Sequence, residues 1–171
     1  MTRLLLGLAV LAGCAVGSSV RVQPNGAGVA YESSRARLTD RDMGGALGVR
    51  NRLYWQASAA CAEPGCVPET VEIAFVNGSD YELDVDPRQV EIGADGLSRT
   101  WTNNDVDQRR VGRAIARGEF FRVTVSRDEF ERIARSDDVR VRFGLTGTSP
   151  FESSLVSRAP FRDLAAALAA R

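Results

Sequence analysis

The sequence predicts a mainly β domain, an antiparallel β-sandwich with two or three short helices, one of them at the C-terminus. Three observations predict this class: many short runs of alternating apolar and polar residues, turn residues between those runs, and two segments with helical periodicity. Hydrophobic residues make up 44% of the 171 residues and charged residues 26%, a composition typical of one folded domain with its own core.

The first thirteen residues have the pattern of an export signal. Arg3 supplies a positive charge, and Leu4 to Leu11 form an apolar run too short to cross a bilayer core of about 30 Å. The run ends in Leu-Ala-Gly before Cys14, which resembles the lipobox of bacterial lipoproteins. The resemblance implies cleavage before Cys14, a diacylglyceryl group on its thiol and, in many bacteria, a further acyl chain such as palmitate. The alternative is an ordinary secretory leader with a chance cysteine.

The lipobox resemblance implies an organisation in three parts. Residues 1–13 are the signal peptide, and residues 14–30, which are small, polar and rich in Gly and Pro, are expected to be a flexible tether. Residues 31–171 are then a single exported domain held at the cell envelope by its lipid. If the host has two membranes, Ala15 after the cysteine resembles the pattern sent to the outer membrane, where the domain faces the periplasm.

The other two cysteines are predicted to form a disulfide. Export places Cys61 and Cys66 in an oxidising compartment, and Pro64-Gly65 between them is typical of a type II turn. A metal site is the alternative, but two thiolates without histidine fall short of the four ligands of structural zinc.

Strand patterns follow the cysteine loop. Val71, Ile73 and Phe75 alternate with polar or small residues, and residues 81–85 alternate likewise, with Asn77-Gly78-Ser79-Asp80 between them as a predicted hairpin turn. The remaining strands are predicted around Leu53 and Trp55 and at residues 90–92, 97–102, 120–125 and 139–145.

Two helices carry clear signals. Ser126 and Glu129 form a capping box, followed by Phe130 and Ile133 on one face. The C-terminal segment 161–168 places Phe161 and two leucines on one stripe, which predicts a short helix docked on the sandwich. A membrane-surface role for that segment is the alternative, although it lacks the basic face of such helices.

The arrangement from Thr70 to the C-terminus, a hairpin signal, short strands and a capped helix leading into residues 139–143, resembles exported bacterial lipoproteins with an immunoglobulin-like β-sandwich of uncharacterised function. The resemblance implies a fold. It implies no enzyme activity, cofactor or binding residue.

An arginine stripe is the main candidate for a binding function. In a helix predicted after Asn104, Arg109, Arg113 and Arg117 fall on one stripe, with Val111, Ala114 and Ile115 roughly opposite. Guanidinium groups in a row would bind the phosphates of lipid headgroups or a carboxylate-bearing polymer. The alternative is an ordinary amphipathic helix that displays its charges to water.

Two other groups of residues have structural interpretations that we prefer. Asp84 with Asp86 and Asp105 with Asp107 offer carboxylates two positions apart, as in calcium sites, but strand-end and helix-start chemistry explains them better. The aromatic side chains would line a ligand groove or fill the core, and we expect the core for all four: Tyr31, Trp55, Tyr81 and Trp101.

Composition narrows the function further. The chain has neither histidine nor lysine, which excludes Ser-His-Asp and Cys-His catalysis, imidazole metal ligands and lysine Schiff bases. Its net charge of zero argues against nucleic-acid binding. We therefore expect a non-enzymatic lipoprotein without cofactor or metal, anchored to the membrane and binding an envelope protein or polymer or serving as an accessory subunit. A carboxylate-dependent envelope hydrolase is the alternative.

Overall fold

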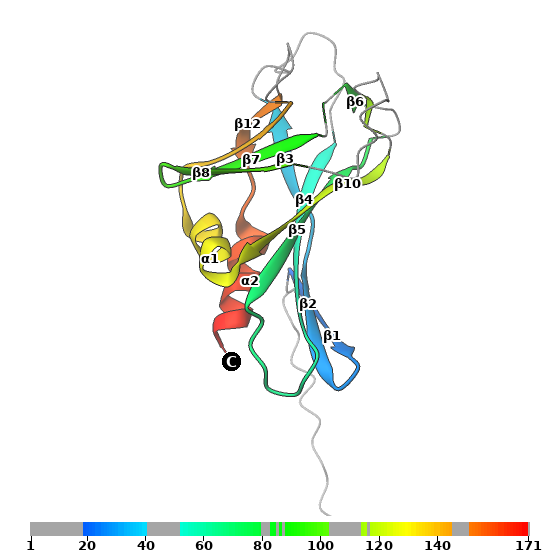
Figure 1. The fold of residues 1–171 in the computed structure, drawn as a ribbon, viewed down its shortest axis with the longest axis vertical. Coiled ribbons are helices and arrows are strands. Elements are labelled where there is room, and N and C mark those ends of the chain that lie inside the picture. The colour runs from blue at the N-terminus through cyan, green and yellow to red at the C-terminus, as the bar shows by residue number, and fades with distance from the viewer. Residues whose placement is uncertain are drawn as a thin grey trace, which may run out of the picture.

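The computed structural model describes residues 19–40, 52–79, 83–84, 86, 88–102, 114–115, 117–144 and 151–170 (Figure 1). These residues form a mainly β fold in which every described strand pairing is antiparallel, together with two helices. The predicted class, mainly β with a C-terminal helix, is confirmed at this level.

A first group of strands is built around β4 (Leu53–Cys61), both of whose edges are paired. One edge pairs with β5 (Thr70–Asn77). The other edge pairs with β2 (Gly28–Ser33) towards the C-terminal end of β4 and with β3 (Ala36–Asp40) towards its N-terminal end. On the outer sides, β1 pairs with β2 and β10 pairs with β5. The bounds of these outer strands are β1 (Val20–Asn25) and β10 (Gly118–Ser126).

A second group continues from β3. Its four strands, in spatial order, are β12 (Phe151–Val156), β11 (Val139–Phe143), β7 (Gln89–Ala94) and β8 (Leu97–Thr102). The two groups are hydrogen-bonded into one bent sheet because β12 pairs with both β3 and β11, with a register shift between Ser153 and Leu155. Figure 1 shows β7 and β8 lying at a steep angle to the long strands β4 and β5. A separate ribbon joins β6 (Leu83–Asp84) to β9 (Ala114–Ile115).

The core lies between these two groups and extends under the helices. Phe75 of β5 meets Phe143 of β11 edge to face, with ring centroids 5.1 Å apart. Towards the other end of the molecule the helices cover the first group in place of strands. There Phe161 lies 4.2 Å from Trp55 and 5.4 Å from Phe130, measured between ring centroids. Apolar burial therefore connects both groups and both helices in one core.

Both predicted helices are present. The first, α1 (Arg127–Arg135), begins at Ser126, whose hydroxyl accepts a hydrogen bond from the Glu129 backbone N–H at 3.2 Å. That half of the predicted capping box is confirmed, whereas the Glu129 carboxylate accepts a hydrogen bond from Arg99 of β8. The second helix, α2 (Ala159–Ala169), buries its apolar stripe against the sheet as expected.

The predicted hairpin after Phe75 is wrong. Both edges of β5 are occupied, by β4 and β10, and β6 pairs with β9 instead. The residues Asn77 to Ser79 nevertheless form a turn, in which the Ser79 N–H donates to Asn77 Oδ1 at 2.8 Å and the Gly78 N–H to the Arg52 carbonyl at 2.7 Å. A strand in the middle of a sheet has no free edge for its sequence neighbour, and the turn chemistry alone does not reveal this.

The tether predicted for residues 14–30 is also corrected. Residues 20–30 form β1 and the start of β2, so the fold begins before Tyr31. Gly26 opens the two-residue hairpin loop with a φ of 59°, a conformation that glycine adopts without strain. The side chains of β1 are mostly exposed, which explains why the segment lacks the apolar pattern of a buried strand.

The strands predicted around Trp55 and at residues 71–75, 90–92, 97–102 and 120–125 are confirmed, and residues 139–143 of the last predicted strand form β11. The two groups face each other as sandwich layers do. An immunoglobulin-like strand order remains a prediction.

Candidate functional site

The arginine stripe is only partly within the described residues. Arg109 and Arg113 lie outside them, as does Cys14, and Arg117 is exposed directly before β10. The helix predicted after Asn104 is wrong at its C-terminal end, because Ala114 and Ile115 form β9. Backbone pairing with β6 supplies the hydrogen bonds there that a helix would otherwise provide.

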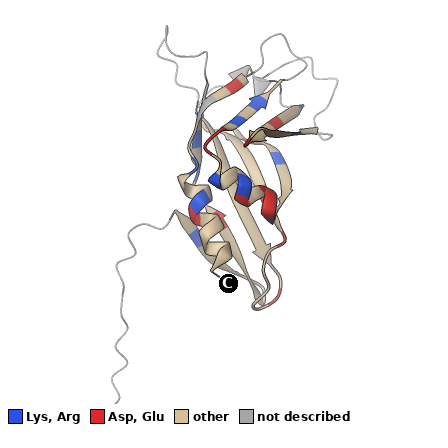
Figure 2. Ribbon diagram, turned by 90° about the vertical axis from the view of Figure 1, so that its left-hand side faces the viewer, with Lys and Arg blue, Asp and Glu red and all other residues tan. Residues whose placement is uncertain are grey.

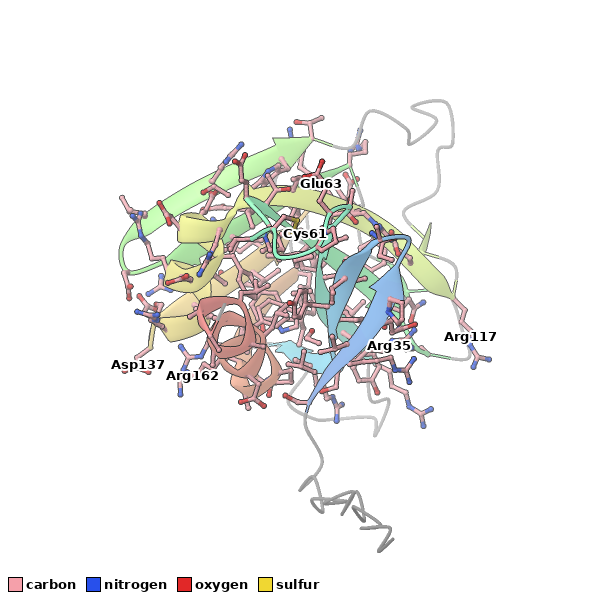
Figure 3. The ribbon with its side chains drawn as sticks, turned by 90° about the horizontal axis from the view of Figure 1, so that it is seen from below. Arg35, Cys61, Glu63, Arg117, Asp137 and Arg162 are labelled. Atoms are coloured by element: carbon pink, nitrogen blue, oxygen red, sulfur yellow. A yellow bond between two sulfur atoms is a disulfide. The ribbon has the colours of Figure 1, made fainter. Side chains whose placement is uncertain are left out.

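The structure joins Cys61 and Cys66 in a disulfide, with their Cα atoms 5.9 Å apart. The predicted turn between them is present: the Cys66 N–H donates to the Glu63 carbonyl at 3.4 Å, and Gly65 has a φ of 73°. Figure 3 shows Cys61 and Glu63 at this loop. The disulfide therefore closes the connection between β4 and β5.

The acidic pairs give no metal site within the described residues. Asp86 is buried, and both of its carboxylate oxygens accept hydrogen bonds at 2.9 Å from Nε of Arg88. This hydrogen bond raises the pKa of the Arg88 guanidinium. No group of three or more acidic, cysteine or histidine residues is positioned for a metal ion in the described part of the chain. Asp105 and Asp107 lie outside it, and so does Tyr81.

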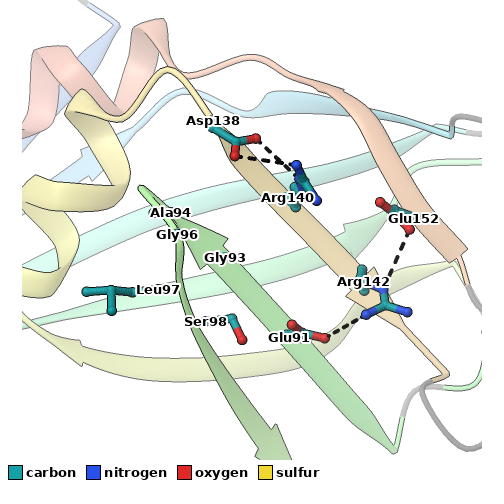
Figure 4. A pocket seen from close by; sticks show the side chains of 10 residues that line it. All are labelled: Glu91, Gly93, Ala94, Gly96, Leu97, Ser98, Asp138, Arg140, Arg142 and Glu152. Carbon is teal, nitrogen blue, oxygen red and sulfur yellow. Dashed lines mark hydrogen bonds and ion pairs between the residues drawn. The ribbon is translucent and has the colours of Figure 1, made fainter.

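Charged residues line the outer face of the second group in a cross-strand row (Figure 4). The register aligns Thr100 of β8, Glu91 of β7, Arg142 of β11 and Glu152 of β12. Arg142 Nη1 lies 3.2 Å from Glu91 Oε2, and its Nε lies 3.7 Å from Glu152 Oε2. The shallow hollow along this row has a volume of about 390 Å³. Its charges of both signs largely neutralise one another.

A second cluster of ion pairs lies on the outer face of the first group. Arg122 of β10 lies 2.8 Å from Glu119 and 2.6 Å from Glu72, measured between guanidinium nitrogens and carboxylate oxygens. Its hydrogen bonds lower the pKa of Glu119, and those carboxylates raise the pKa of Arg122. Because these side chains are about half exposed, the cluster contributes little to stability.

The most distinctive hollow is a groove between β8 and α1, with a volume of about 460 Å³. Leu97, Arg99 and Trp101 alternate along β8 and pair in register with the buried residues Ala94, Ile92 and Val90, so their side chains share the inner face of the sheet. The groove is lined mainly by these sheet residues, by the cap residue Ser126 and by the α1 residues Asp128, Glu129, Arg132 and Ile133.

Polar contacts across this β8–α1 groove fix its shape. The Arg99 guanidinium lies 4.9 Å above the Trp101 ring and 2.9 Å from the Glu129 carboxylate of α1. The Asp95 N–H donates to the Ser136 hydroxyl, which ties the β7–β8 turn to the end of the helix. Figure 2 shows charges of both signs on the two helices. The groove is thus held open by contacts at its polar rim.

Two features of the groove are unsatisfied in the described part of the chain. Leu97 is 58% exposed, and the buried indole N–H of Trp101 has no hydrogen-bond acceptor. A buried donor without an acceptor costs about 1–3 kcal/mol. Of the four aromatic residues expected in the core, Tyr31 and Trp55 are buried, whereas Trp101 is only partly buried.

The backbone of β8 adds a third feature. Among the described strands, β8 is paired on one side only, with β7. Asp95 and Gly96 form a two-residue loop with φ of 52° and 77°, and the antiparallel register then turns the backbone N–H and C=O groups of alternate residues, Ser98, Thr100 and Thr102, towards the unpaired edge. An extended polypeptide would find hydrogen-bonding partners along this edge.

Sequence reasoning did not identify the β8–α1 groove. The alternation in residues 97–102 predicts that Leu97, Arg99 and Trp101 share one face of a strand, and this was the one indication of the groove in the sequence. The sequence did not show that α1 lies beside that face.

None of the described helices combines the length and apolar character needed to cross a membrane. Comparison with known proteins gave no further guide, since no family model, curated protein or solved structure matches this chain.

Proposed function

We propose that this chain is a cell-envelope lipoprotein, anchored through Cys14, whose exported domain binds a partner protein and catalyses no reaction. The lipobox-like residues before Cys14 support the anchor. In a host with two membranes we place the protein on the outer membrane, facing the periplasm. The facing groups of antiparallel strands support an immunoglobulin-like sandwich as the form of the domain.

The observation that carries partner binding is the unpaired edge of β8 beside the β8–α1 groove. Strand addition to an open sheet edge is a recurrent way of recognising extended polypeptides, with backbone hydrogen bonds for affinity and neighbouring pockets for specificity. Here Ser98, Thr100 and Thr102 offer the backbone groups, and the groove beside them offers the exposed side chain of Leu97.

A proline substitution tests this binding mode. Thr100→Pro removes an N–H that points to the unpaired edge and leaves the hydrogen bonds between β7 and β8 in place, whereas Thr100→Ala keeps that N–H. We expect a photo-crosslinker at Ser98 in cells to give a discrete adduct that is lost in Thr100→Pro and retained in Thr100→Ala. Equal adducts in both variants, with unchanged melting temperatures, would contradict strand addition.

Intact mass of the membrane-extracted protein tests the anchor. We expect the mass of residues 14–171 plus acyl chains, and we expect the acyl mass to be lost in Cys14→Ala. An unacylated protein cleaved at another position would leave a secreted domain and remove the membrane from the proposal.

A carboxylate-dependent hydrolase is the second candidate, because Glu91 and Glu152 both lie next to Arg142. In Figure 4 the Arg142 guanidinium lies between the two carboxylates, in the space that a glycosidic oxygen or attacking water would need. This geometry favours a structural ion-pair row. Hydrolysis of envelope polymers that is abolished by both Glu91→Gln and Glu152→Gln would favour the enzyme instead.

A further inference from the structure

The position of the first described residue limits how far the domain can lie from its proposed anchor. The first described residue, Ser19, follows Cys14 by five positions. A fully extended chain covers at most about 3.6 Å per residue, so Ser19 lies within roughly 18 Å of the lipid-bearing residue. This span is much shorter than the span from Cys14 to residue 30 that the predicted tether would provide.

Two contacts attach Ser19 to the domain. Its carbonyl accepts a hydrogen bond from the Ser34 N–H, just after β2, and its hydroxyl donates to the Asp163 carboxylate of α2. These contacts place Ser19 at one defined position on the domain, between the start of β1 and the first half of α2. The surface around this place is the part of the domain held nearest to the bilayer.

Exposed arginines flank this position. Arg21 follows Ser19 by two positions in β1, and Arg35 directly follows Ser34, the backbone partner of Ser19. Arg37, two positions further along in β3, is also exposed. The nearest acid in the β1–β2 register is Glu32, opposite Arg21, and its carboxylate accepts a hydrogen bond from Gln56. Asp163, which accepts a hydrogen bond from the Ser19 hydroxyl, is a second acid at this place, so the three arginines exceed these two carboxylates by one positive charge.

We propose that the surface formed by Arg21, Arg35 and Arg37 around Ser19 rests on the phosphate-bearing headgroups of the anchoring membrane. The inference rests on the proposed lipid anchor. Guanidinium groups bind phosphate oxygens through paired N–H donors, and basic residues close to an anionic surface are attracted to it within a Debye length of about 8 Å. The short span between Cys14 and Ser19 allows the three arginines to approach the headgroups to within this distance.

This orientation directs the unpaired edge of β8 away from the bilayer. In the view from below, Arg35 and the strands of the β7–β8 hairpin lie on different sides of the molecule (Figure 3). A domain resting on its arginines therefore presents the β8–α1 groove to the surrounding compartment, where a partner protein has access to it.

Fluorescence quenching from lipid headgroups tests the orientation. The acylated protein is reconstituted in phosphatidylethanolamine vesicles containing phosphatidylglycerol and a headgroup-attached quencher, after its intact mass has confirmed the acyl chains. A fluorophore is attached either to Gln23→Cys on β1 or to Ser98→Cys on β8, both exposed positions. With Cys14 acylated and the remaining cysteines in a disulfide, each variant has one reactive thiol.

We expect quenching to be several-fold stronger at position 23 than at position 98. The double variant Arg21→Gln/Arg35→Gln should bring this ratio close to one, because each basic residue near an anionic surface favours the membrane-facing orientation by roughly fivefold. The matched control Arg135→Gln/Arg140→Gln removes two exposed arginines elsewhere and should keep the ratio.

Equal quenching at the two positions, or a ratio that both double variants leave unchanged, would overturn the proposed orientation while the mass still supports the anchor. A protein without acyl chains would overturn the orientation together with the anchor on which it rests.

Discussion

Replacement of Phe161 by alanine is expected to destabilise the domain strongly. The side chain is fully buried, and its ring lies against Trp55 of β4 and Phe130 of α1. Truncation of a buried phenylalanine costs about 3–5 kcal/mol, through lost transfer free energy and the cavity that remains. We therefore expect a loss of about 4 kcal/mol and, for a chain of this length, a fall in Tm of roughly 8–16 °C.

Urea unfolding followed by tryptophan fluorescence measures this loss, because Trp55 reports on the same contact. The matched control is Ala166→Gly on the exposed face of α2, which tests helix propensity alone and should cost about 1 kcal/mol. If Phe161→Ala cost no more than the glycine variant, α2 would not be docked on the sheet and the single core described above would be wrong.

Three further predictions concern stability. Reduction of the Cys61–Cys66 disulfide should cost only about 2 kcal/mol and leave the protein folded in urea titrations, since the closed loop is short; unfolding at room temperature would contradict this. Gly28→Ala should lower Tm markedly, because the added Cβ would lie 2.0 Å from a backbone carbonyl oxygen. Gly93→Ala should leave Tm nearly unchanged, because the atom nearest to its added Cβ lies 3.6 Å away. Equal Tm values for the two variants would refute the close approach at Gly28. The hydrogen bonds from Arg122 lower the pKa of Glu119 below its ordinary value of 4.5. They stabilise the folded state by less than about 1 kcal/mol above pH 4.5, and this stabilisation is lost as the pH falls through the lowered pKa of Glu119. Arg122→Gln should therefore reduce the pH dependence of the unfolding free energy below pH 5, and an unchanged pH profile would contradict this assignment.

Strand positions were predictable where burial leaves a pattern. In β5 the residues that alternate in the sequence, Val71, Ile73 and Phe75, are each fully buried, and the same holds for Val90 and Ile92 to within a few per cent. Side-chain periodicity reports which face of a strand is buried. It does not report which strand lies alongside, and the hairpin prediction after Phe75 failed for that reason.

The exposed elements left little signal. β1 has no apolar face, so its small and polar residues were indistinguishable from a linker. Ala114 and Ile115 fitted a helical stripe equally well, and their pairing with β6 depends on residues about thirty positions away. The β8–α1 groove requires both Trp101 and Glu129 to be placed in space, and no local pattern joins them.

The strand that joins the two groups also governs the order in which the domain can form. β12 closes the sheet against β3, near the opposite end of the chain, and the Trp55 indole N–H donates to the Ser157 carbonyl across 102 positions of sequence. Such a high contact order makes folding slow, because long loops must close before their contacts can compensate for the lost entropy. Among the N-terminal strands, β3 can complete its pairing only after the last twenty residues are present. The connection between the two groups of strands therefore forms only when the C-terminal segment is available to pair.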